Sequence, residues 1–402
     1  MDTEQRWLAL WAAMLGYMLD ALDVLLYVFA IQVLRAEFHW SAATAGLVSS
    51  ATLVSSAIGG IGAGIVADRI GRTRTLIFTI LLYSIGSAGS ATSTGIVSLL
   101  AWRAVVGLGL GGEWSAGAVL VAESWPPEHR GKAVGLMQSG WALGYMLAAV
   151  TTAAILPRFG WRILFLVGVL PAFFTIWIQQ KVKEPAIWTA KKARSSLAVL
   201  FRPPLGRITL MATLLATSVL FAYWGLFTWL PGFLSAPREQ GGAGLSIFNT
   251  SAWIFTMQMG AFLGYVSFGW LADRFGRRPV FFVYVFAAAV IAPIYGLTPR
   301  WAGASSERWL LALGPIVGFC GTGFFSLFGT VLAELYPTSV RGAGQGFVYN
   351  FGRAISALAP FAVGAIADRS GLGAALALNS GFFLIGSVLV FTLPETKNTE
   401  LK

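Results

Sequence analysis

Five ionisable side chains lie inside long apolar segments of the sequence, namely Asp20, Asp23, Arg103, Glu113 and Arg353. A charge placed in hydrocarbon costs at least ~2.5 kcal/mol, so each of these residues is a candidate functional residue. A guanidinium holds a carboxylate through two parallel hydrogen bonds, and Arg353 is therefore the predicted anchor for an anionic ligand. The alternative is that Arg353 pairs permanently with Asp20 or Asp23 and only holds two parts of the protein together.

The acidic members of this set are candidates for binding a proton. Asp20 and Asp23 are three residues apart and share one face of a helix, with Tyr17 on the same stripe. With all five groups ionised the interior carries one net negative charge, a bound monocarboxylate adds a second, and protonation of one acid removes it. Asp20 and Asp23 are the leading predicted proton carriers, and Glu113 and Arg103 are further coupling candidates. The alternative for each is a structural ion pair.

Neutral polar and aromatic residues within the apolar segments are predicted to line the same cavity, although such residues also make contacts between helices. The predicted cavity residues are Tyr17, Gln138, Tyr145, Tyr223, Trp224, Gln258 and Asn350.

The composition identifies the elements that must position these side chains. Of the 402 residues, 56% are hydrophobic and only 11% are charged, and the mean hydropathy is +0.72. Soluble domains carry about 25% charged residues. Spanning helices need about 20 predominantly apolar residues, and an all-α polytopic membrane protein with twelve of them is predicted, at 8–31, 43–67, 75–94, 96–122, 133–155, 161–180, 208–234, 245–272, 279–298, 309–335, 342–367 and 371–393.

The distribution of Lys and Arg predicts the orientation. If the termini and the even-numbered loops share one side, that side carries 19 of the 28 basic residues, whereas the other side carries seven and two lie inside spans. Basic loops stay in the cytoplasm, so both termini are expected there, in a multi-pass protein of the cell membrane. The basic, proline-containing stretch 181–207 is expected to be a cytoplasmic linker between two six-helix bundles, 1–180 and 208–402.

The sequence repeats itself across that linker. The pattern G-x-x-x-D-R-x-G-R occurs at residues 64–72 and again at 269–277, and a second pattern follows the fourth and tenth spans with identical spacing. The charged residues of these repeats are Asp68, Arg72, Asp273 and Arg277 in the first pattern, and Glu123, Arg130, Glu334 and Arg341 in the second.

Two parallel six-helix repeats with these doubled motifs resemble the major facilitator superfamily, over nearly the whole chain. The resemblance implies a fold of two pseudo-symmetric bundles that rock against each other around a midplane site. In that scheme the repeated acidic and basic residues gate the cytoplasmic end, where Asp68 or Asp273 pairs with a nearby Arg or with a helix N-terminus of the opposite bundle. The alternative is that the arginines only enforce the topology.

Finer features of the first, fourth and eleventh spans resemble the sialate, metabolite and monocarboxylate proton symporters. They are D-A-L-D at 20–23, the glycine-rich segment 103–114 and N-F-G-R at 350–353. The aromatic-acid symporters usually have Gly at the position of Ala21, which weakens that assignment. The resemblance implies symport of protons with a small organic anion, a monocarboxylate or a sialate-like acid. The alternatives are a drug/proton antiporter or a neutral sugar symporter, whose usual signatures in the fifth and seventh spans are absent.

Several other classes are disfavoured by the residue inventory. The single cysteine, Cys320, excludes a disulfide framework, and neither a metal-ligand cluster nor a nucleophile–base pair is present. The G-L-G-L-G-G run at 107–112 lies inside a span and follows no strand, so a dinucleotide site is not expected. We therefore expect no enzyme activity, no cofactor, no metal and no nucleic acid. The expected partners are the organic anion, protons and lipid, and the expected functional unit is a monomer.

Overall fold

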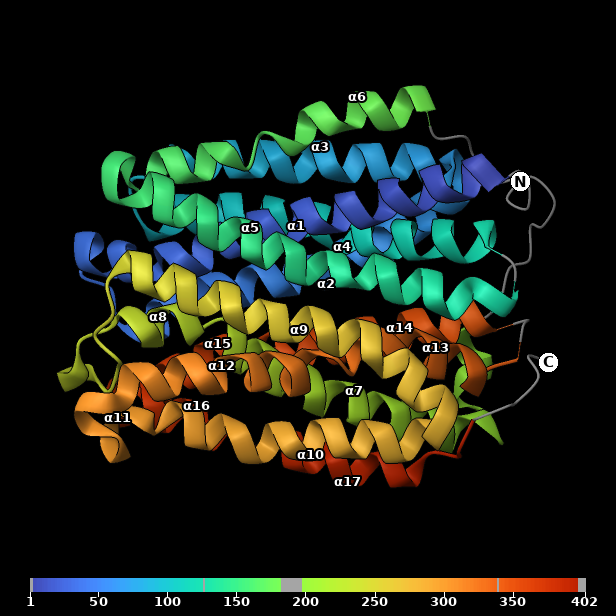
Figure 1. Cartoon of the computed structure of the whole chain (residues 1–402). Coiled ribbons are helices and arrows are strands. Elements are labelled where there is room, and N and C mark those ends of the chain that lie inside the picture. The colour runs from blue at the N-terminus through green and yellow to red at the C-terminus, as the bar shows by residue number, and fades with distance from the viewer. Residues whose placement is uncertain (1–2, 126, 182–196, 338–339, 397–402) are drawn as a thin grey trace.

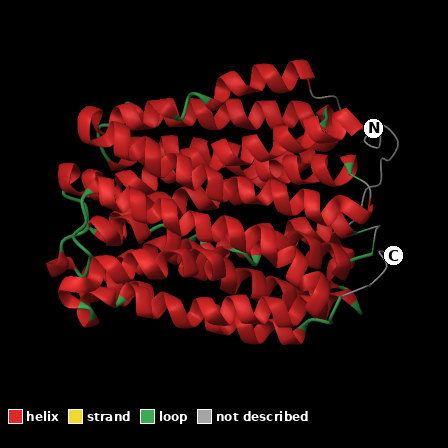
Figure 2. Ribbon diagram, viewed as in Figure 1, coloured by secondary structure: helices red, strands yellow, loops and turns green. Residues whose placement is uncertain are grey.

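The computed structural model describes residues 3–125, 127–181, 197–337 and 340–396, and within these ranges the chain is helical with no strand (Figure 2). Long helices run side by side, with the N-terminal half of the chain forming one bundle and the C-terminal half the other (Figure 1). Both chain termini lie at the same end of the molecule. We call this the terminal end and the opposite end the distal end. The predicted class, an all-α membrane protein of two six-helix bundles, is confirmed.

The N-terminal bundle consists of α1 (Thr3–Phe38), α2 (Ala42–Ile70), α3 (Arg72–Ala91), α4 (Ile96–Ser124), α5 (Pro127–Val167) and α6 (Pro171–Lys181). Helix α5 contains two spans, because Gly160 with φ 74° and ψ 178° reverses the chain inside it. Glycine adopts a positive φ without the steric cost that a Cβ would bring. The sixth span therefore combines the end of α5 with α6, close to the predicted boundary at residue 161.

The C-terminal bundle has more helix breaks. Its helices are α7 (Leu205–Phe227), α8 (Leu230–Ser235), α9 (Ile247–Phe275), α10 (Arg277–Gly296), α11 (Thr298–Trp301), α12 (Ser306–Thr322), α13 (Phe325–Leu335), α14 (Arg341–Ser356), α15 (Leu358–Ser370), α16 (Leu372–Asn379) and α17 (Gly381–Leu389). Short 3₁₀ turns occupy 197–201, 238–240, 303–305 and 390–392. Four spans are each divided in two: the seventh into α7 and α8, the tenth into α12 and α13, the eleventh into α14 and α15, and the twelfth into α16 and α17.

Nine helical segments within the described ranges, some of them continuing across a break, are long and apolar enough to cross a membrane. One of the nine, Lys132–Thr175, contains both the fifth and the sixth span. The third span, α3, is rich in Ser, Thr and Gly, which lowers its hydropathy. The tenth contains residues 327–330, whose side chains lie outside the described residues. These three features account for the difference from the twelve predicted spans.

The internal repeat is visible in how the helices pack. In the N-terminal bundle, a Cβ added at Gly59 of α2 would collide with the carbonyl oxygen of Leu108 in α4. In the C-terminal bundle, a Cβ at Gly264 of α9 would lie 2.6 Å from the carbonyl oxygen of Phe319 in α12. These two glycines occupy the same place in the two repeats. Both bundles therefore use a glycine to bring equivalent helices into backbone contact, as small residues do in membrane proteins generally.

The bundles meet along two seams. Helix α2 packs against α15 and α14, and α5 packs against α9. The segment predicted as the linker, 181–207, is described only at Lys181 and from residue 197 onward. The division into 1–180, 181–207 and 208–402 stays a prediction.

We expect Gly59→Ala to lower the apparent melting temperature of the detergent-solubilised protein, because the new methyl group meets a backbone carbonyl that cannot rotate away. Overpacking of this kind costs about 1–3 kcal/mol. The matched control is Gly62→Ala on the same helix, where a Cβ meets nothing within 4 Å; replacing a helical glycine by alanine in open space is neutral or slightly stabilising. Equal melting temperatures for the two variants would contradict the packing argument.

Candidate functional site

A small cavity lies between the two bundles, at about half the length of the spans. Residues from α1, α2, α4 and α5 form one side, and residues from α7, its C-cap and α14 form the other. The lining residues are Tyr17, Asp20, Val24, Tyr27, Val28, Ser49, Thr52, Leu53, Ser56, Arg103, Leu110, Trp141, Trp224, Thr228 and Arg353. The cavity volume is about 40 Å³, which is room for a few waters at most. Ligand sites usually measure roughly 300–1,000 Å³, so an organic ligand needs the bundles to move apart.

Arg353 enters this cavity from the last turn of α14. Its side chain is only 6% exposed, and Nη1 donates a hydrogen bond of 3.0 Å to Ser56 Oγ in the opposite bundle. The guanidinium carbon lies 4.8 Å from the ring centroid of Tyr349. The eleventh span breaks directly after Ser356, so Arg353 also lies at a helix C-terminus, where the negative end of the helix dipole favours a cation. This arrangement keeps a positive charge at the interface of the two bundles.

Asp23 and Arg103 form an ion pair inside the N-terminal bundle. Arg103 Nη1 lies 3.8 Å from Asp23 Oδ2, and both side chains are at most 1% exposed. The Arg103 guanidinium also lies 5.4 Å from the ring centroid of Tyr27. The two charges come from α1 and α4 of the same bundle. They can therefore stay paired while the bundles move. The predicted role of Asp23 and Arg103 in proton coupling stays a prediction.

Asp20 and Glu113 are buried without such a partner. Asp20 is 3% exposed and Glu113 0%, and neither makes a hydrogen bond or an ion pair with the described part of the chain. Glu113 reaches α1 one turn before Asp20, because a Cβ added at Gly16 would lie 2.6 Å from Glu113 Oε1. Two unpaired acids are thus neighbours beside the cavity.

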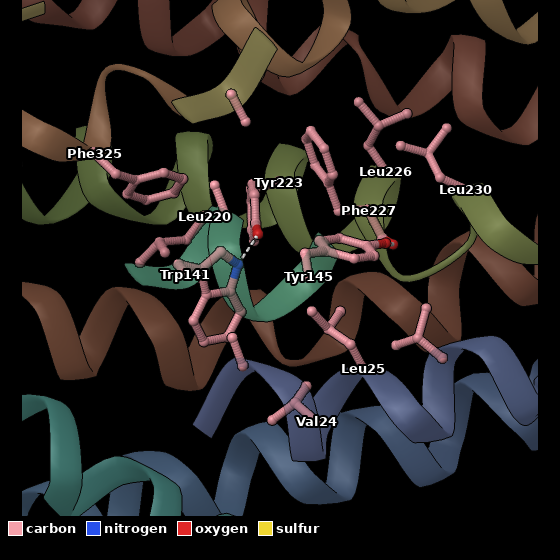
Figure 3. Close-up of a cluster of buried hydrophobic side chains, with 14 of the residues drawn as sticks. Val24, Leu25, Trp141, Tyr145, Leu220, Tyr223, Leu226, Phe227, Leu230 and Phe325 are labelled. Carbon is pink, nitrogen blue, oxygen red and sulfur yellow. Dashed lines mark hydrogen bonds between the residues drawn. The ribbon is translucent and has the colours of Figure 1, made fainter. Parts of the chain in front are cut away.

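The predicted neutral residues fall into two groups. Tyr17 lines the cavity with its ring centroid 5.2 Å from that of Trp141, and Trp224 lines it 5.9 Å from Trp141. The hydroxyl of Tyr223 accepts a hydrogen bond of 2.6 Å from Trp141 Nε1, so these two rings join the bundles just beside the cavity (Figure 3).

The others are buried but do not line the cavity. The Tyr145 hydroxyl donates to the carbonyl oxygen of Phe227 at 2.9 Å, which is a contact between α5 and α7. Asn350 Nδ2 donates to the carbonyl oxygen of Gly346 in its own helix. Gln138 and Gln258 are 6% and 1% exposed. A role for these four residues in ligand binding stays a prediction.

Sequence reasoning missed Ser56 and Trp141. Serines are common in α2 and only the fold shows which one faces Arg353. Trp141 lies one helical turn before Tyr145 and three residues after Gln138, two of the predicted cavity residues, so its spacing was the available signal.

Only two of the eight predicted gating side chains are described, and both belong to the C-terminal bundle. Arg277 Nη2 lies 3.3 Å from Glu334 Oε1, and Thr396 Oγ1 donates to Glu334 Oε2 at 2.6 Å. The side chains of Asp68, Arg72, Glu123, Arg130, Asp273 and Arg341 lie outside the described residues. Gating by all eight stays a prediction.

Comparison with known proteins decides the family. The model of the Major Facilitator Superfamily matches residues 13–250 and 244–402. The chain belongs to this superfamily. The niacin transporter NiaP of Acinetobacter baylyi is 31% identical over 88% of this chain and 85% of its own, and the sialic acid transporter NanX of Escherichia coli K12 is 28% identical over 92% and 89%. Among solved structures, a D-xylose-proton symporter has the same fold, with a TM-score of 0.80, 18% identity, and coverage of 98% of this chain and 99% of the other.

Membership of the superfamily settles the broad class of the protein. It is a multi-pass transporter of the cell membrane and not an enzyme. A facilitator carries its substrate by alternating access, in which one bundle rocks against the other around a central site. The cavity that holds Arg353 lies where such a site is expected, with walls from both bundles.

Removing the cation of the buried ion pair tests whether Asp23 is structural. Arg103→Met leaves Asp23 as an uncompensated buried charge, a loss that typically costs about 3–5 kcal/mol. We therefore expect a clearly lower melting temperature for Arg103→Met, and a partial return in the double variant Arg103→Met with Asp23→Asn. The control is Arg158→Met, on an exposed arginine. If the double variant is no more stable than Arg103→Met, the two residues do not stabilise each other.

Proposed function

We propose that this facilitator is a proton-coupled symporter that imports a small organic anion, a monocarboxylate or a sialate-like acid, with both chain termini in the cytoplasm. The observation that carries the proposal is the buried Arg353 in a cavity shared by the two bundles, with the unpaired acid Asp20 in the same cavity. A cation supplies a binding point for the anion, and a carboxylic acid supplies a binding point for the proton.

The environment of Arg353 supports a role in anion binding. Its described hydrogen bond to Ser56 is to a neutral hydroxyl of the other bundle, at 3.0 Å. A carboxylate ligand can replace such a bond by a charge-assisted one, which is roughly twice as strong as a neutral one. The rings of Tyr17, Trp141 and Trp224 offer flat apolar faces beside it. A small acid with an apolar or ring-shaped body fits this combination.

The balance of charges supports coupling to protons. Because Asp23 and Arg103 compensate each other, the charges left around the cavity are Asp20, Glu113 and Arg353, with a net charge of −1 when all are ionised. An anionic substrate makes this −2, and binding one proton restores −1. Repulsion between charges is strong where water is excluded, so the substrate and the proton each favour binding of the other. Asp20 and Glu113 are the proposed proton sites.

The relatives support the choice of substrate class. One is named as a niacin transporter and another as a sialic acid transporter. Both named substrates are carboxylic acids of modest size with a ring. The excess of Lys and Arg on the side of the termini, 19 against seven, supports the proposed orientation in the membrane.

Two other substrates are possible on this fold. In a drug/proton antiporter, the usual cationic drug would be repelled by Arg353, whereas a neutral sugar would leave the guanidinium without a charged ligand. Uptake into proteoliposomes of labelled nicotinate, sialate, lactate and xylose, each with and without a pH gradient, separates these possibilities. Gradient-driven uptake of xylose without uptake of any acid would overturn the proposal.

Shortening Arg353 tests the anion site. We expect Arg353→Ala to abolish uptake of the transported acid, because the other arginine that lines the cavity, Arg103, is already paired with Asp23. Arg353→Lys keeps the charge but loses the two-point grip, and its affinity should fall by roughly 10- to 100-fold, the equivalent of one hydrogen bond to a charged group. Arg158→Ala, at an exposed arginine, is the control. Unchanged affinity in Arg353→Ala would remove this residue from the site.

Neutralising the two unpaired acids tests the coupling. In the native protein, lowering the pH outside should accelerate uptake, because a proton enters with each anion. We expect the variant that removes the proton site, Asp20→Asn or Glu113→Gln, to lose this acceleration by low external pH. The same variant should still exchange internal for external substrate when the pH is equal on both sides. Glu37→Gln, at an exposed carboxylate bonded to Trp161 and Arg162, should behave like the native protein. If both acid variants keep the full pH response, the proton is carried elsewhere.

A further inference from the structure

The signature that marks the terminal end of α2 and of α9 occurs a third time, at the distal end of α15. Residues 64–71, 269–276 and 364–371 all read G-x-x-A-D-R-x-G. The last glycine of each copy has a positive φ, 113° at Gly71, 102° at Gly276 and 84° at Gly371. The three copies therefore end their helices with the same backbone turn. The third copy points toward the opposite side of the membrane.

The third copy makes direct contacts with the opposite bundle. The carboxylate of Asp368 accepts hydrogen bonds from the backbone N–H groups of Ala42 and Ala43, at 2.8 and 2.9 Å. These two residues open α2, whose N-terminal N–H groups have no partner within the helix. An aspartate oxygen is among the best acceptors for such groups, and the positive end of the helix dipole favours its charge.

The first glycine of the same copy serves the same contact. A Cβ added at Gly364 would lie 2.5 Å from the carbonyl oxygen of Ala42, and a Cβ at Gly46 would collide with the carbonyl of Pro360. The N–H of Phe361 also donates to Ser50 Oγ at 3.3 Å. The distal half of α15 is thus in backbone contact with the first turns of α2, with Asp368 at its outer edge.

The second seam has no equivalent of Asp368. The fifth span, which is the first part of α5, ends at the distal end with R-x-G at residues 158–160, and Gly160 has a φ of 74°. The position that corresponds to Asp368 is occupied by Pro157. The partner helix of that seam, α9, begins with its own cap, since Ser246 Oγ accepts from the N–H of Asn249. In α2 the equivalent residue is Ser41, whose Oγ accepts a hydrogen bond from the N–H of Thr44. Asp368 of the other bundle accepts two further hydrogen bonds from this helix N-terminus.

We propose that Asp368 is a gating residue of the distal end, which holds α15 on the N-terminus of α2 while that end is closed and releases it when the end opens. The hydrogen bonds join two bundles that must separate there in each transport cycle, so they stabilise one state and not the other. The proposal depends on alternating access alone and not on the identity of the substrate or on protons.

Distances between spin labels across the distal end test this assignment. Labels are attached at Arg158→Cys and Ala304→Cys, which are exposed on the N- and C-terminal bundles respectively, in a Cys320→Ala background. Asp368→Ala should raise the ratio of long to short distances about five-fold, the effect of losing one helix cap. Asp368→Asn keeps an acceptor oxygen and should shift the ratio less.

Two further variants keep the test decisive. Arg369→Ala removes a neighbouring exposed charge on the same turn and should leave the distances unchanged. Gly364→Ala pushes α15 away from α2 and should shift the ratio in the same direction as Asp368→Ala. The proposal is overturned if Asp368→Ala and Gly364→Ala both leave the distance distribution unchanged, or if Arg369→Ala shifts it as much as Asp368→Ala does. Because no substrate is added, these results are independent of any failure to find uptake of an organic acid.

Discussion

A carboxylate buried in a membrane protein needs either a cation beside it or a proton on it, because an isolated charge is too costly at low dielectric. The N-terminal bundle contains a paired carboxylate and unpaired ones close together. Asp23 has Arg103 at 3.8 Å, whereas Asp20 and Glu113 have no described partner. Arg353, which lines the other side of the cavity, belongs to the opposite bundle. Movement between the bundles therefore changes the surroundings of Asp20 but not those of Asp23.

The repeat relates the two bundles by more than their sequence motifs. Equivalent glycines, Gly59 and Gly264, bring equivalent helix pairs into backbone contact, so each bundle is tightly packed internally. Close packing resists gradual deformation, and such bodies move as units rather than bending. The contacts between the bundles include glycine contacts of α2 with α15 and also hydrogen bonds between side chains, such as the bond from Trp141 to Tyr223. Bonds of this kind can be exchanged for others when the bundles separate.

The fold was predictable from the sequence because hydrophobic length and the doubled motifs are strong signals, and the spans agree with the observed helices apart from the breaks inside four of them. The site was predictable only in part. All five ionisable residues are buried, as the cost of charge in lipid implies, but Asp20 and Asp23 are equivalent in sequence. Which of them meets Arg103 depends on how α1 is rotated against α4. Likewise, whether Tyr145 faces the cavity or bonds to Phe227 depends on the contact between the bundles.

The third copy of the signature is related to the first two in a different way. The first two copies stand after spans with the same direction, and a search for a repeat of six helices finds them at equal spacing. The copy at Asp368 ends a span that runs the opposite way, so it belongs to a repeat of three helices with inverted direction. Its meaning appears only when α15 is seen against α2. The signature occurs twice at the terminal end of the molecule and once at the distal end. In the proposed scheme each closed state has its own stabilising contacts, and the balance between them sets how readily the transporter turns over.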